Sequence, residues 1–550
     1  MPTSPPAPPQ ESYAPPARTA GELGVLLAGW LVVCGLNLWW LSRQQAPLPW
    51  DQAHHFLLAL DYKRALASPL TWTNIFSVAI KYPYLFHLSL AFQFLIFGVS
   101  VPLAAGVNCL WLLVLMLAVW RLARGLAGPW LALAAAWFLA LLPLTAGLSR
   151  EVLLELCLGA TVALGVGALA ASQGLSRRRG VLALGLAVGL GMLAKWTYPL
   201  YLAAPFLYTF LWGRRRGLAV DWRGLGWALL ILLALALPWY LHSPVTLVKI
   251  LVGDAWRYGA SHGMPPVGSL AAWLIYPEML VNEAFWLPLS PFLVVGLAWG
   301  LGPGRRRGAG LILAWLLGGL VLISLMRNKD MRFLFPLVPA AAILSLAWLS
   351  SLPARWLRGL VGGLGLGLAL AAYLGSSFGV GPLAGERLVE LGGARLVWSA
   401  PRAGYSRPPS AADWGVAPLV EALAADWAAH GAGSRPPRVG VLASQVHFHK
   451  SGFAAWAAAH GRAMDFVSFL EPEQWRPGQE AADLWQQTAG LDYLIFKTGD
   501  LGVEPAYARA RELLAPELAQ RARLVSQVAL PDGSTARLLA LGPAAGPATR

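Results

Sequence analysis

The apolar stretch LGVLLAGWLVVCGLNLWWL (Leu23–Leu41) is followed, after residues 42–46, by PLPWDQAHHFLLALDYKRAL (Pro47–Leu66), which is rich in ionisable groups. Only 13% of the residues in the chain are charged, whereas 57% are hydrophobic. A helix needs about 20 mostly apolar residues to cross a bilayer, and the first stretch has that length. It is too long for a signal-peptide core and lacks a clear small-residue cleavage site, so we expect a retained membrane anchor.

Further apolar windows follow along the first two-thirds of the chain, and they predict an α-helical multi-pass membrane protein. They lie at Val101–Trp120, Pro129–Ala146, Val152–Ala171, Val181–Ala194, Tyr198–Trp212, Leu225–Leu241, Trp286–Leu301, Ala309–Leu325, Phe333–Ser350 and Leu360–Leu374. Together with the first stretch they indicate about eleven transmembrane helices. We therefore expect a transmembrane domain over residues 23–376.

Arginines occupy every second gap between these windows, and they predict the orientation of the chain. They are Arg121, Arg124, the triplets Arg177–Arg179, Arg214–Arg216 and Arg305–Arg307, and the pair Arg355 and Arg358. Positively charged loops stay on the cytoplasmic side of a membrane. Residues 1–22, which are Pro-rich and expected to be disordered, would then be cytoplasmic. The chain after about Ser376 would lie outside the cell (inner) membrane.

The net charge of +15 is distributed along the chain in agreement with this topology. From Gly381 onward, basic and acidic residues are nearly equal in number, so almost all of the excess positive charge lies upstream. The charge therefore indicates membrane orientation and not binding to nucleic acid. Cys34, Cys109 and Cys157 all fall in apolar windows and the tail has no cysteine, so no disulfide framework is expected.

Residues 377–550 are expected to form a separate extracytoplasmic α/β domain. The segments RVGVLA (Arg438–Ala443), MDFVSF (Met464–Phe469) and LDYLIFK (Leu491–Lys497) have the pattern of buried strands. Alternation of such strands with helices is typical of a small α/β domain. Helix-like segments lie at Ala411–Ala429, Gly452–His460, Glu480–Thr488 and Glu504–Arg521, and a final hairpin turns at Pro531-Asp532-Gly533.

The gaps without arginine triplets face outward in this topology, and they hold unusual ionisable residues. The first outer loop is large (residues 42–100), and its second half, KYPYLFHLSLAFQFLIFG, is amphipathic and Pro-broken, as in helices that lie along a membrane surface. The outward residues are Asp51, His54 and His55 in the first loop, Arg150, Glu151 and Glu155 in LSREVLLEL, Lys195 in AKWTYP, and Lys329, Asp330 and Arg332 in MRNKDMRFLFP.

Lys195 is the outward cation whose position most favours a function. It lies in a turn between two apolar windows of about 15 residues, and helices of that length reach only about 22 Å. The hydrocarbon core is roughly 30 Å thick, so the turn is expected in a sunken cavity. Ionisable groups at membrane depth normally line a site or a pathway. Lys249, Arg257 and Arg327 fit equally well as cations that snorkel to the headgroups.

The histidines fit a metal site less well. His54 and His55 have no further ligand at helical spacing. His447 and His449 lie on either side of Phe448 after a predicted strand, and a surface loop is the better interpretation there.

The outward residues together favour one kind of substrate. Asp51 and Glu155 supply carboxylates, and Lys195 and Arg332 supply cations, on one outer face. This set suits an anionic substrate with a lipid tail, because the cations can hold a phosphate while a carboxylate acts as a base. The chain has no GxxxxGK[ST] motif, so nothing indicates a soluble nucleotide site.

In these motifs the chain resembles the polyprenyl-phosphate-sugar-dependent glycosyltransferases of the GT-C fold. The resemblance is to the bacterial branch related to protein O-mannosyltransferases and to the aminoarabinose transferase acting on lipid A. It covers about Gly21 to Ser350. The motifs are, in order, PWDQAHHFLLALDY with Asp51, YPYLFHLSLAF, SREVLLE, AKWTYP and KDMRFLFPLVPA.

The resemblance implies catalytic roles for two carboxylates. Asp51 would be the base of an inverting transfer. Glu155 would assist Asp51 or a divalent cation such as Mg²⁺ or Mn²⁺, with Glu151 as a rival for this role. The family often has Asp-Glu where this chain has Asp51-Gln52, which argues against a metal at that position.

The resemblance also implies residues that bind the substrate. Lys195 would hold the lipid-linked phosphate, with Arg332 or Lys329 as the second cation. The remaining candidates for substrate binding are His54, His55, Tyr82, Arg150 and Glu151.

The implied function is transfer of a hexosyl or pentosyl group from a polyprenyl-phosphate donor to a lipid, glycan or protein acceptor, among membrane lipids on the outer face. Two non-enzymatic alternatives stay open: a lipid or sugar transporter or flippase, and a scaffold whose outer tail binds a polymer. Transporters often have internal repeats and charges at mid-membrane. This chain shows no convincing repeat, and its ionisable residues gather on one side, which favours the enzyme.

Overall fold

The computed structural model describes residues 20–68, 72–79, 81–303, 308–399, 404–430, 435–468, 481–502 and 505–541. Two expectations concern residues outside these ranges. They are the disorder of residues 1–19 of the N-terminal segment and the position of the triplet Arg305–Arg307.

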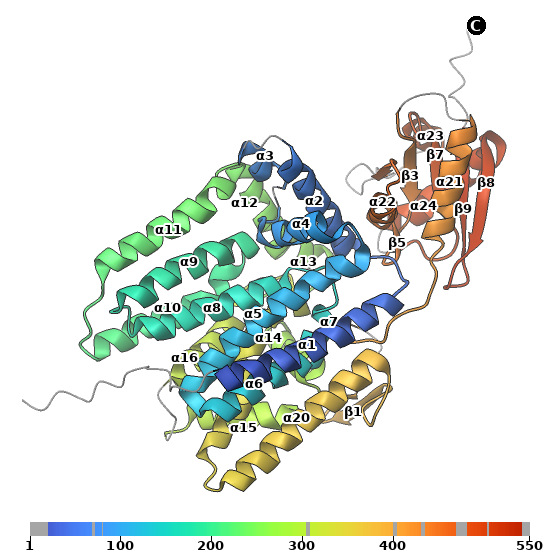
Figure 1. The fold of residues 1–550 in the computed structure, drawn as a ribbon. Helices are drawn as coiled ribbons and strands as arrows, with labels where there is room; N and C mark the ends of the chain where they lie inside the picture. The colour runs from blue at the N-terminus through green and yellow to red at the C-terminus, as the bar shows by residue number, and fades with distance from the viewer. Residues whose placement is uncertain are drawn as a thin grey trace, which may run out of the picture.

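Each apolar window of the sequence coincides with a helix or with a run of consecutive helical segments (Figure 1). The predicted α-helical multi-pass fold is therefore confirmed. The segments are α1 (Ala20–Arg43), α5 (Val101–Ala127), α6 (Pro129–Leu141), α7 (Pro143–Leu148), α8 (Glu155–Ser172), α9 (Arg178–Ala194), α10 (Tyr198–Arg215), α11 (Trp222–Tyr240), α15 (Ser290–Leu301), α16 (Ala309–Leu313), η3 (Ala314–Gly318), α17 (Gly319–Ser324), α18 (Met331–Leu334), η4 (Phe335–Leu337), α19 (Val338–Ala347), η5 (Trp348–Ser351) and α20 (Arg355–Phe378).

Among the described residues, 6 helices or runs are long and apolar enough to cross a membrane by length and composition alone, compared with the eleven or so expected. They are α1, α5, α8, α11, the run Met331–Ser351 and α20. The other windows form shorter or less apolar helices. One reason is proline: α6 ends at Leu141, and Pro143, which cannot continue a helical hydrogen-bond ladder, starts α7.

Burial separates inner helices from outer ones. In the most apolar 18-residue window of each helix, 94% of the Met331–Ser351 window is buried, whereas only 22% of the α11 window is buried. The outer helices expose large apolar side chains, among them Leu31 and Val32 on α1 and Leu360 on α20. So much exposed apolar surface is rare on a water-soluble protein, and it suits contact with lipid.

The segments between α1 and α5 and between α11 and α15 form further helices. The first loop forms α2 (Trp50–Ala67), α3 (Trp72–Ser77) and α4 (Leu85–Phe97), and α2 packs along α4 through Phe56 and Phe94. The later loop forms α12 (Pro244–Val252), η1 (Gly253–Arg257), α13 (Tyr258–Ser261), α14 (Leu270–Met279) and η2 (Leu280–Phe285). Of these helices, α2, α3, α4, α12 and α13 lie toward one end of the helical body (Figure 1).

The C-terminal part contains the predicted α/β domain. Its five-stranded sheet has the order β6-β3-β7-β9-β8, formed by β3 (Arg438–Leu442), β6 (Asp465–Ser468), β7 (Tyr493–Lys497), β8 (Ala522–Ala529) and β9 (Thr535–Leu541). Strand β3 runs parallel to β6 and β7, and the terminal hairpin adds β9 and β8 in antiparallel fashion. The accompanying helices are α21 (Val416–His430), α22 (Lys450–Ala459), α23 (Ala481–Gln487) and α24 (Pro505–Arg521).

The segment between α20 and this domain belongs to the helical body. It forms a two-stranded hairpin, β1 (Arg387–Leu391) and β2 (Ala394–Ser399). The side chain of Asn282 in η2 holds β2, because Nδ2 donates to Arg395 O at 3.0 Å and Oδ1 accepts from Val397 N at 3.0 Å. The hydrophobic core of the α/β domain takes its residues from Trp414 onward, together with Ala46.

His447 and His449 attach the α/β domain to the segment before α2. The expectation of a surface loop is wrong for the buried His449, whereas His447 lies in a turn and is half-buried. His447 Nδ1 donates to Pro47 O at 3.0 Å, and His449 Nε2 donates to Leu48 O at 3.1 Å. His449 is buried in β5 (Phe448–His449), and burial lowers its pKa to about 4. The neutral imidazole of His449 makes two hydrogen bonds, so it is stable in this buried position. The histidines on either side of Phe448 therefore serve to bind the domain to the segment before α2.

Candidate active site

Asp51 lies in the first turn of α2 and contacts Arg332 from α18. Pro49 immediately precedes the helix, a position at which the backbone N–H that proline lacks would have no partner within the helix. Arg332 Nη1 donates to Asp51 Oδ2 at 2.7 Å. The two residues that the sequence placed on one outer face are therefore in direct contact.

Asp330 fixes the guanidinium of Arg332. Its Oδ1 accepts from the backbone N of Arg332 at 2.8 Å, and its Oδ2 accepts from Nε at 2.9 Å and pairs with Nη2 at 2.8 Å. The planar guanidinium thus lies between two carboxylates, those of Asp330 and Asp51. Such a fork is well suited to hold an oxyanion in a defined orientation.

Lys195 forms a second ion pair nearby. It lies at the C-terminal end of α9, and its Nζ donates to Glu155 Oε1 at 2.9 Å. The side chains of Lys195 and Glu155 are only 9% and 2% exposed. Lys195 Nζ also lies 4.9 Å from the centre of the Phe333 ring, beside Arg332 in the chain. The structure therefore brings Glu155 to Lys195 and not to Asp51, the partner that the resemblance implied.

The charge around Asp51 keeps it ionised. Burial alone raises the pKa of its carboxyl, but the charge and hydrogen bond of Arg332, helped by Lys81 and Lys195, lower it below its usual value. Lys81 was missed in the sequence, although it opens the KYPYLFH segment that contains Tyr82. Three cations from distant parts of the chain thus act on one carboxylate.

The histidines of α2 belong to an aromatic cluster behind the site. His55 Nδ1 lies 2.9 Å from His87 Nε2, and its ring packs edge-on against Tyr82 with centres 4.7 Å apart. Burial, followed by the neighbouring His87, lowers the pKa of His55 far below its usual value. His54 is exposed, and its ring lies 5.9 Å from that of Tyr82. These residues form an aromatic cluster on the helix that carries Asp51.

Arg150 and Glu151 lie on the other side of the first turn of α2. Gln52 Nε2 donates to Glu151 Oε2, and Gln52 Oε1 accepts from Val152 N at 3.0 Å. Burial raises the pKa of Glu151 against the opposing charge of Arg407, and burial lowers that of Arg150 to about 10. Neither residue contacts Asp51 directly.

Lys329 is the weaker of the two proposed second cations. Its Nζ donates to the carbonyl oxygens of Ser324 at 2.6 Å and Met326 at 2.5 Å. Burial lowers its pKa to about 8. Arg332 contacts Asp51, whereas Lys329 binds backbone carbonyls. Arg332 therefore fits the role of the second cation better than Lys329 does.

Tyr405 is a further neighbour that no sequence motif indicated. The segment 404–410 passes so close to α7 that a Cβ on Gly147 would lie 2.8 Å from the backbone of Tyr405. Burial raises the pKa of the Tyr405 hydroxyl, and the charges of Arg332, Asp330 and Glu155 act on it. The linker to the α/β domain therefore contributes a side chain on which charges from both ion pairs act.

A divalent cation does not fit the carboxylates in this arrangement. Within the described ranges, no three His, Cys, Asp or Glu side chains come together in a way that could hold a metal ion. Asp51 and Asp330 both bind Arg332, and Glu155 binds Lys195. Their charge is thus balanced by Arg and Lys.

Comparisons with known proteins show which fold this chain has. Residues 81–242 match the family described as dolichyl-phosphate-mannose-protein mannosyltransferase. This stretch contains Glu155 and Lys195 but neither Asp51 nor Arg332. No curated protein sequence matches the chain.

Solved structures match over nearly the whole chain. ArnT from Cupriavidus metallidurans, bound to undecaprenyl phosphate, matches with a TM-score of 0.56 and 16% identity over 95% of this chain and 98% of that one. Its apo state has a TM-score of 0.59 and 15% identity with the same coverage. The apo oligosaccharyltransferase of Archaeoglobus fulgidus has a TM-score of 0.52 and 11% identity over 88% of this chain and 70% of that one. The chain therefore has the GT-C fold, and the resemblance seen in the sequence is confirmed.

Proposed function

We propose that this protein is a glycosyltransferase that transfers a sugar from a polyprenyl-phosphate donor to a lipid, glycan or protein acceptor by an inverting reaction. The observation that carries the proposal is the contact between Asp51 and Arg332, with Lys195 and Lys81 acting on the same carboxylate. This arrangement gives a chain with the GT-C fold one candidate base, Asp51, with three cations close to it. The ArnT structure bound to undecaprenyl phosphate supports a donor of this chemical class.

The proposed reaction assigns one role to each group. A carboxylate oxygen of Asp51 takes the proton of the acceptor hydroxyl or amine, and the acceptor atom attacks the anomeric carbon of the sugar. The bond from that carbon to the phosphate oxygen breaks, and polyprenyl phosphate leaves with the electron pair. The leaving phosphate gains negative charge, which Arg332 and Lys195 stabilise because oriented cations act strongly away from bulk water.

Arg332 couples donor binding to the strength of the base. When the donor phosphate binds to Arg332, it competes with Asp51 for the same guanidinium. Loss of that hydrogen bond removes one of the two effects by which Arg332 lowers the pKa of Asp51, and the negative charge of the phosphate offsets the other, the positive charge of Arg332. Asp51 then becomes a stronger base at the moment when the donor is in place.

We further propose that the N-terminus is cytoplasmic and that the α/β domain is extracytoplasmic. The arginine gaps support this orientation. The last turn of α10 and the connection to α11, which together contain Arg214–Arg216, lie at the end of the helical body away from the α/β domain (Figure 1). A cysteine introduced at Gly217 should resist an impermeant thiol reagent in intact cells, whereas one at Gln45 should react. Labelling at Gly217 from outside would reverse the proposed active-site face.

The function is tested with purified protein in nanodiscs and a panel of polyprenyl-phosphate sugars. We expect at least one donor to release polyprenyl phosphate, and the release to depend on Asp51. If every donor stays intact but moves between the leaflets of a vesicle, the protein is a transporter and the proposal is wrong.

A further inference from the structure

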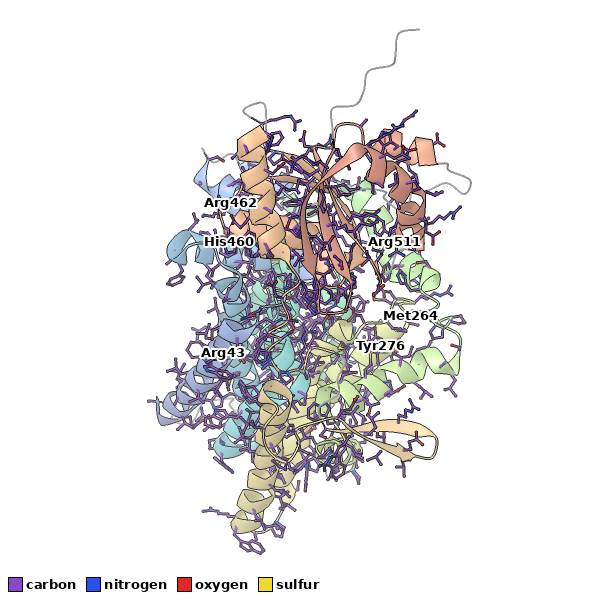
Figure 2. The ribbon with its side chains drawn as sticks, turned by 90° about the vertical axis from the view of Figure 1, so that its right-hand side faces the viewer. Arg43, Met264, Tyr276, His460, Arg462 and Arg511 are labelled. Carbon is purple, nitrogen blue, oxygen red and sulfur yellow. The ribbon has the colours of Figure 1, made fainter. Side chains whose placement is uncertain are left out.

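A pocket of about 380 Å³ lies between the helical body and the α/β domain, apart from the Asp51–Arg332 pair. Its walls come from the end of α1, the segment 44–49, the N-terminal ends of α2 and α5, and α22. Figure 2, in which the α/β domain faces the viewer, labels His460, one of the lining residues. We call this cavity the interdomain pocket.

The polar wall of the interdomain pocket has more positive than negative charge. It contains Arg150, Arg407 and one carboxylate, Glu151. Arg407 Nη2 lies 3.7 Å from Glu151 Oε1, so these two charges offset each other. Arg150 remains as the excess cation.

Arg150 is unusual because its guanidinium has no hydrogen-bond partner. Arg150 is only 2% exposed, and all three of its side-chain nitrogens lack a partner within the described part of the chain. The guanidinium lies 4.7 Å from the centre of the Trp40 ring, which also lines the pocket. Buried polar groups are nearly always paired, so an unpaired guanidinium in a pocket wall points to an anion that completes it.

The helices around the interdomain pocket strengthen this preference. Pro49 and Gln52 line it at the start of α2, and Val101 and Pro102 line it at the start of the 27-residue helix α5. Helix N-termini carry partial positive charge, which favours an anion even though Pro102 has no N–H and the N–H of Leu103 is bound by the Ser100 side chain.

The remaining walls are apolar. Trp40, Leu41 and Ala105 line the pocket from the helical body, and Ala455 and Trp456 line it from α22. An occupant with a charged head and an apolar chain fits both parts, whereas a fully polar ion fits only one.

We propose that the interdomain pocket binds the anionic head, a phosphate or a carboxylate, of an amphiphilic acceptor. The inference rests on the proposed function. Gln52 lines the pocket, while its neighbour Asp51 faces Arg332 on the other side of the same helical turn. An acceptor held by its anionic head in the pocket is therefore anchored beside the base, and the donor phosphate is held by Arg332.

The test measures binding of dodecyl phosphate and dodecanol to the full chain in neutral phosphatidylcholine nanodiscs without any donor, by native mass spectrometry. We expect the parent to bind dodecyl phosphate and not dodecanol. Arg150→Gln should weaken binding about tenfold or more, because it removes the unpaired guanidinium and because hydrogen bonds to charged groups are among the stronger ones. Arg150→Lys, which keeps the charge, should retain part of the affinity.

Arg43→Gln is the matched control, because Arg43 is an exposed cation at the end of α1 that is outside the pocket lining (Figure 2). Its binding should equal that of the parent. Equal binding of dodecanol, or an equal loss in Arg43→Gln, overturns the inference. Displacement of dodecyl phosphate by inorganic phosphate at the same concentration shows a site for free anions and also overturns it.

The binding measurement is independent of the proposed function. If dodecyl phosphate binds through Arg150 but no donor is ever cleaved, the pocket stands and the glycosyltransferase proposal fails. If donor is cleaved but dodecyl phosphate does not bind, only the assignment of the pocket fails.

Discussion

The two ion pairs of the candidate active site differ in how far water reaches them. The side chains of Asp51 and Arg332 are 46% and 24% exposed, whereas those of Glu155 and Lys195 are 2% and 9% exposed. A partly exposed pair gains little net free energy from its contact, so it can exchange its partner for a substrate. A buried pair cannot separate without leaving an unpaired charge away from water.

This difference suggests a division of work between the two pairs. The Asp51–Arg332 pair can open when donor and acceptor arrive, and we assign it to the chemical step. The Glu155–Lys195 pair stays closed and supplies a fixed cation beside the phosphate. Variants of each pair can test this division, because the exposed pair should affect the reaction and the buried pair should affect stability and donor binding.

The largest effect is expected from Asp51→Asn. The change removes the proton acceptor but keeps nearly the same volume, so donor binding should persist. Release of polyprenyl phosphate should fall by about 10²–10⁴-fold, the usual contribution of a general base. The rate is measured at saturating donor and acceptor.

Asp61→Asn is the control for that change, because Asp61 lies on the same helix α2. Asp61 pairs with Arg64 three residues on, and the side chains of both are well exposed. Its replacement should alter the rate by less than about fivefold, since exposed pairs contribute only about 0.2–1 kcal/mol. If Asp51→Asn retains the parent rate, the assignment of the base is wrong.

The next largest effect is expected on stability, from Lys195→Ala. It leaves the buried carboxylate of Glu155, whose Oε2 already lacks a partner among the described residues, without its cation. Loss of one member of a buried pair costs about 3–5 kcal/mol of unfolding free energy. The measurement is the temperature of unfolding in detergent.

The double variant Lys195→Met with Glu155→Leu separates stability from binding. Apolar replacement of a whole buried pair is often neutral, so the double variant should unfold near the temperature of the parent. Its affinity for the donor should nevertheless be lower, because the fixed cation is gone. Donor affinity equal to that of the parent would show that Lys195 has only a structural role.

The sequence was sufficient for the fold because the relevant signals are local. Apolar windows predict helices, and short runs such as Leu491–Lys497 predict buried strands, without knowledge of their neighbours. Asp51, Lys195 and Arg332 were also identifiable, since ionisable residues stand out between apolar windows. Lys81 carries the same signal, because it directly precedes the YPYLFH motif.

The pairings within the site could not be predicted, because they depend on packing between distant segments. Nothing in the sequence indicates that Glu155 contacts Lys195 or that Arg332 contacts Asp51, which lies 281 positions away. Tyr405 lies in a linker without any motif, and only the close approach to Gly147 brings it to the site.

The smallest of the three effects is a shift in pH dependence from Arg332→Gln. Asp51 acts as a base only when it is deprotonated, so activity falls as the pH drops through its pKa. In the parent, Arg332 holds that pKa below its usual value against the effect of burial, with help from Lys81 and Lys195. Without Arg332 the effect of burial is opposed less, so the pKa rises. The acid limb of kcat/KM, which reports the free enzyme, should therefore move to higher pH.

Two further variants make the pH measurement decisive. Arg332→Lys keeps the positive charge but not the planar fork, so its acid limb should lie between those of the parent and Arg332→Gln. Arg64→Gln removes an exposed cation from α2 that pairs with Asp61, and its limb should coincide with that of the parent. If the profile of Arg332→Gln superimposes on the parent profile, Arg332 does not control the base, and the exchange of partners at the exposed pair does not occur.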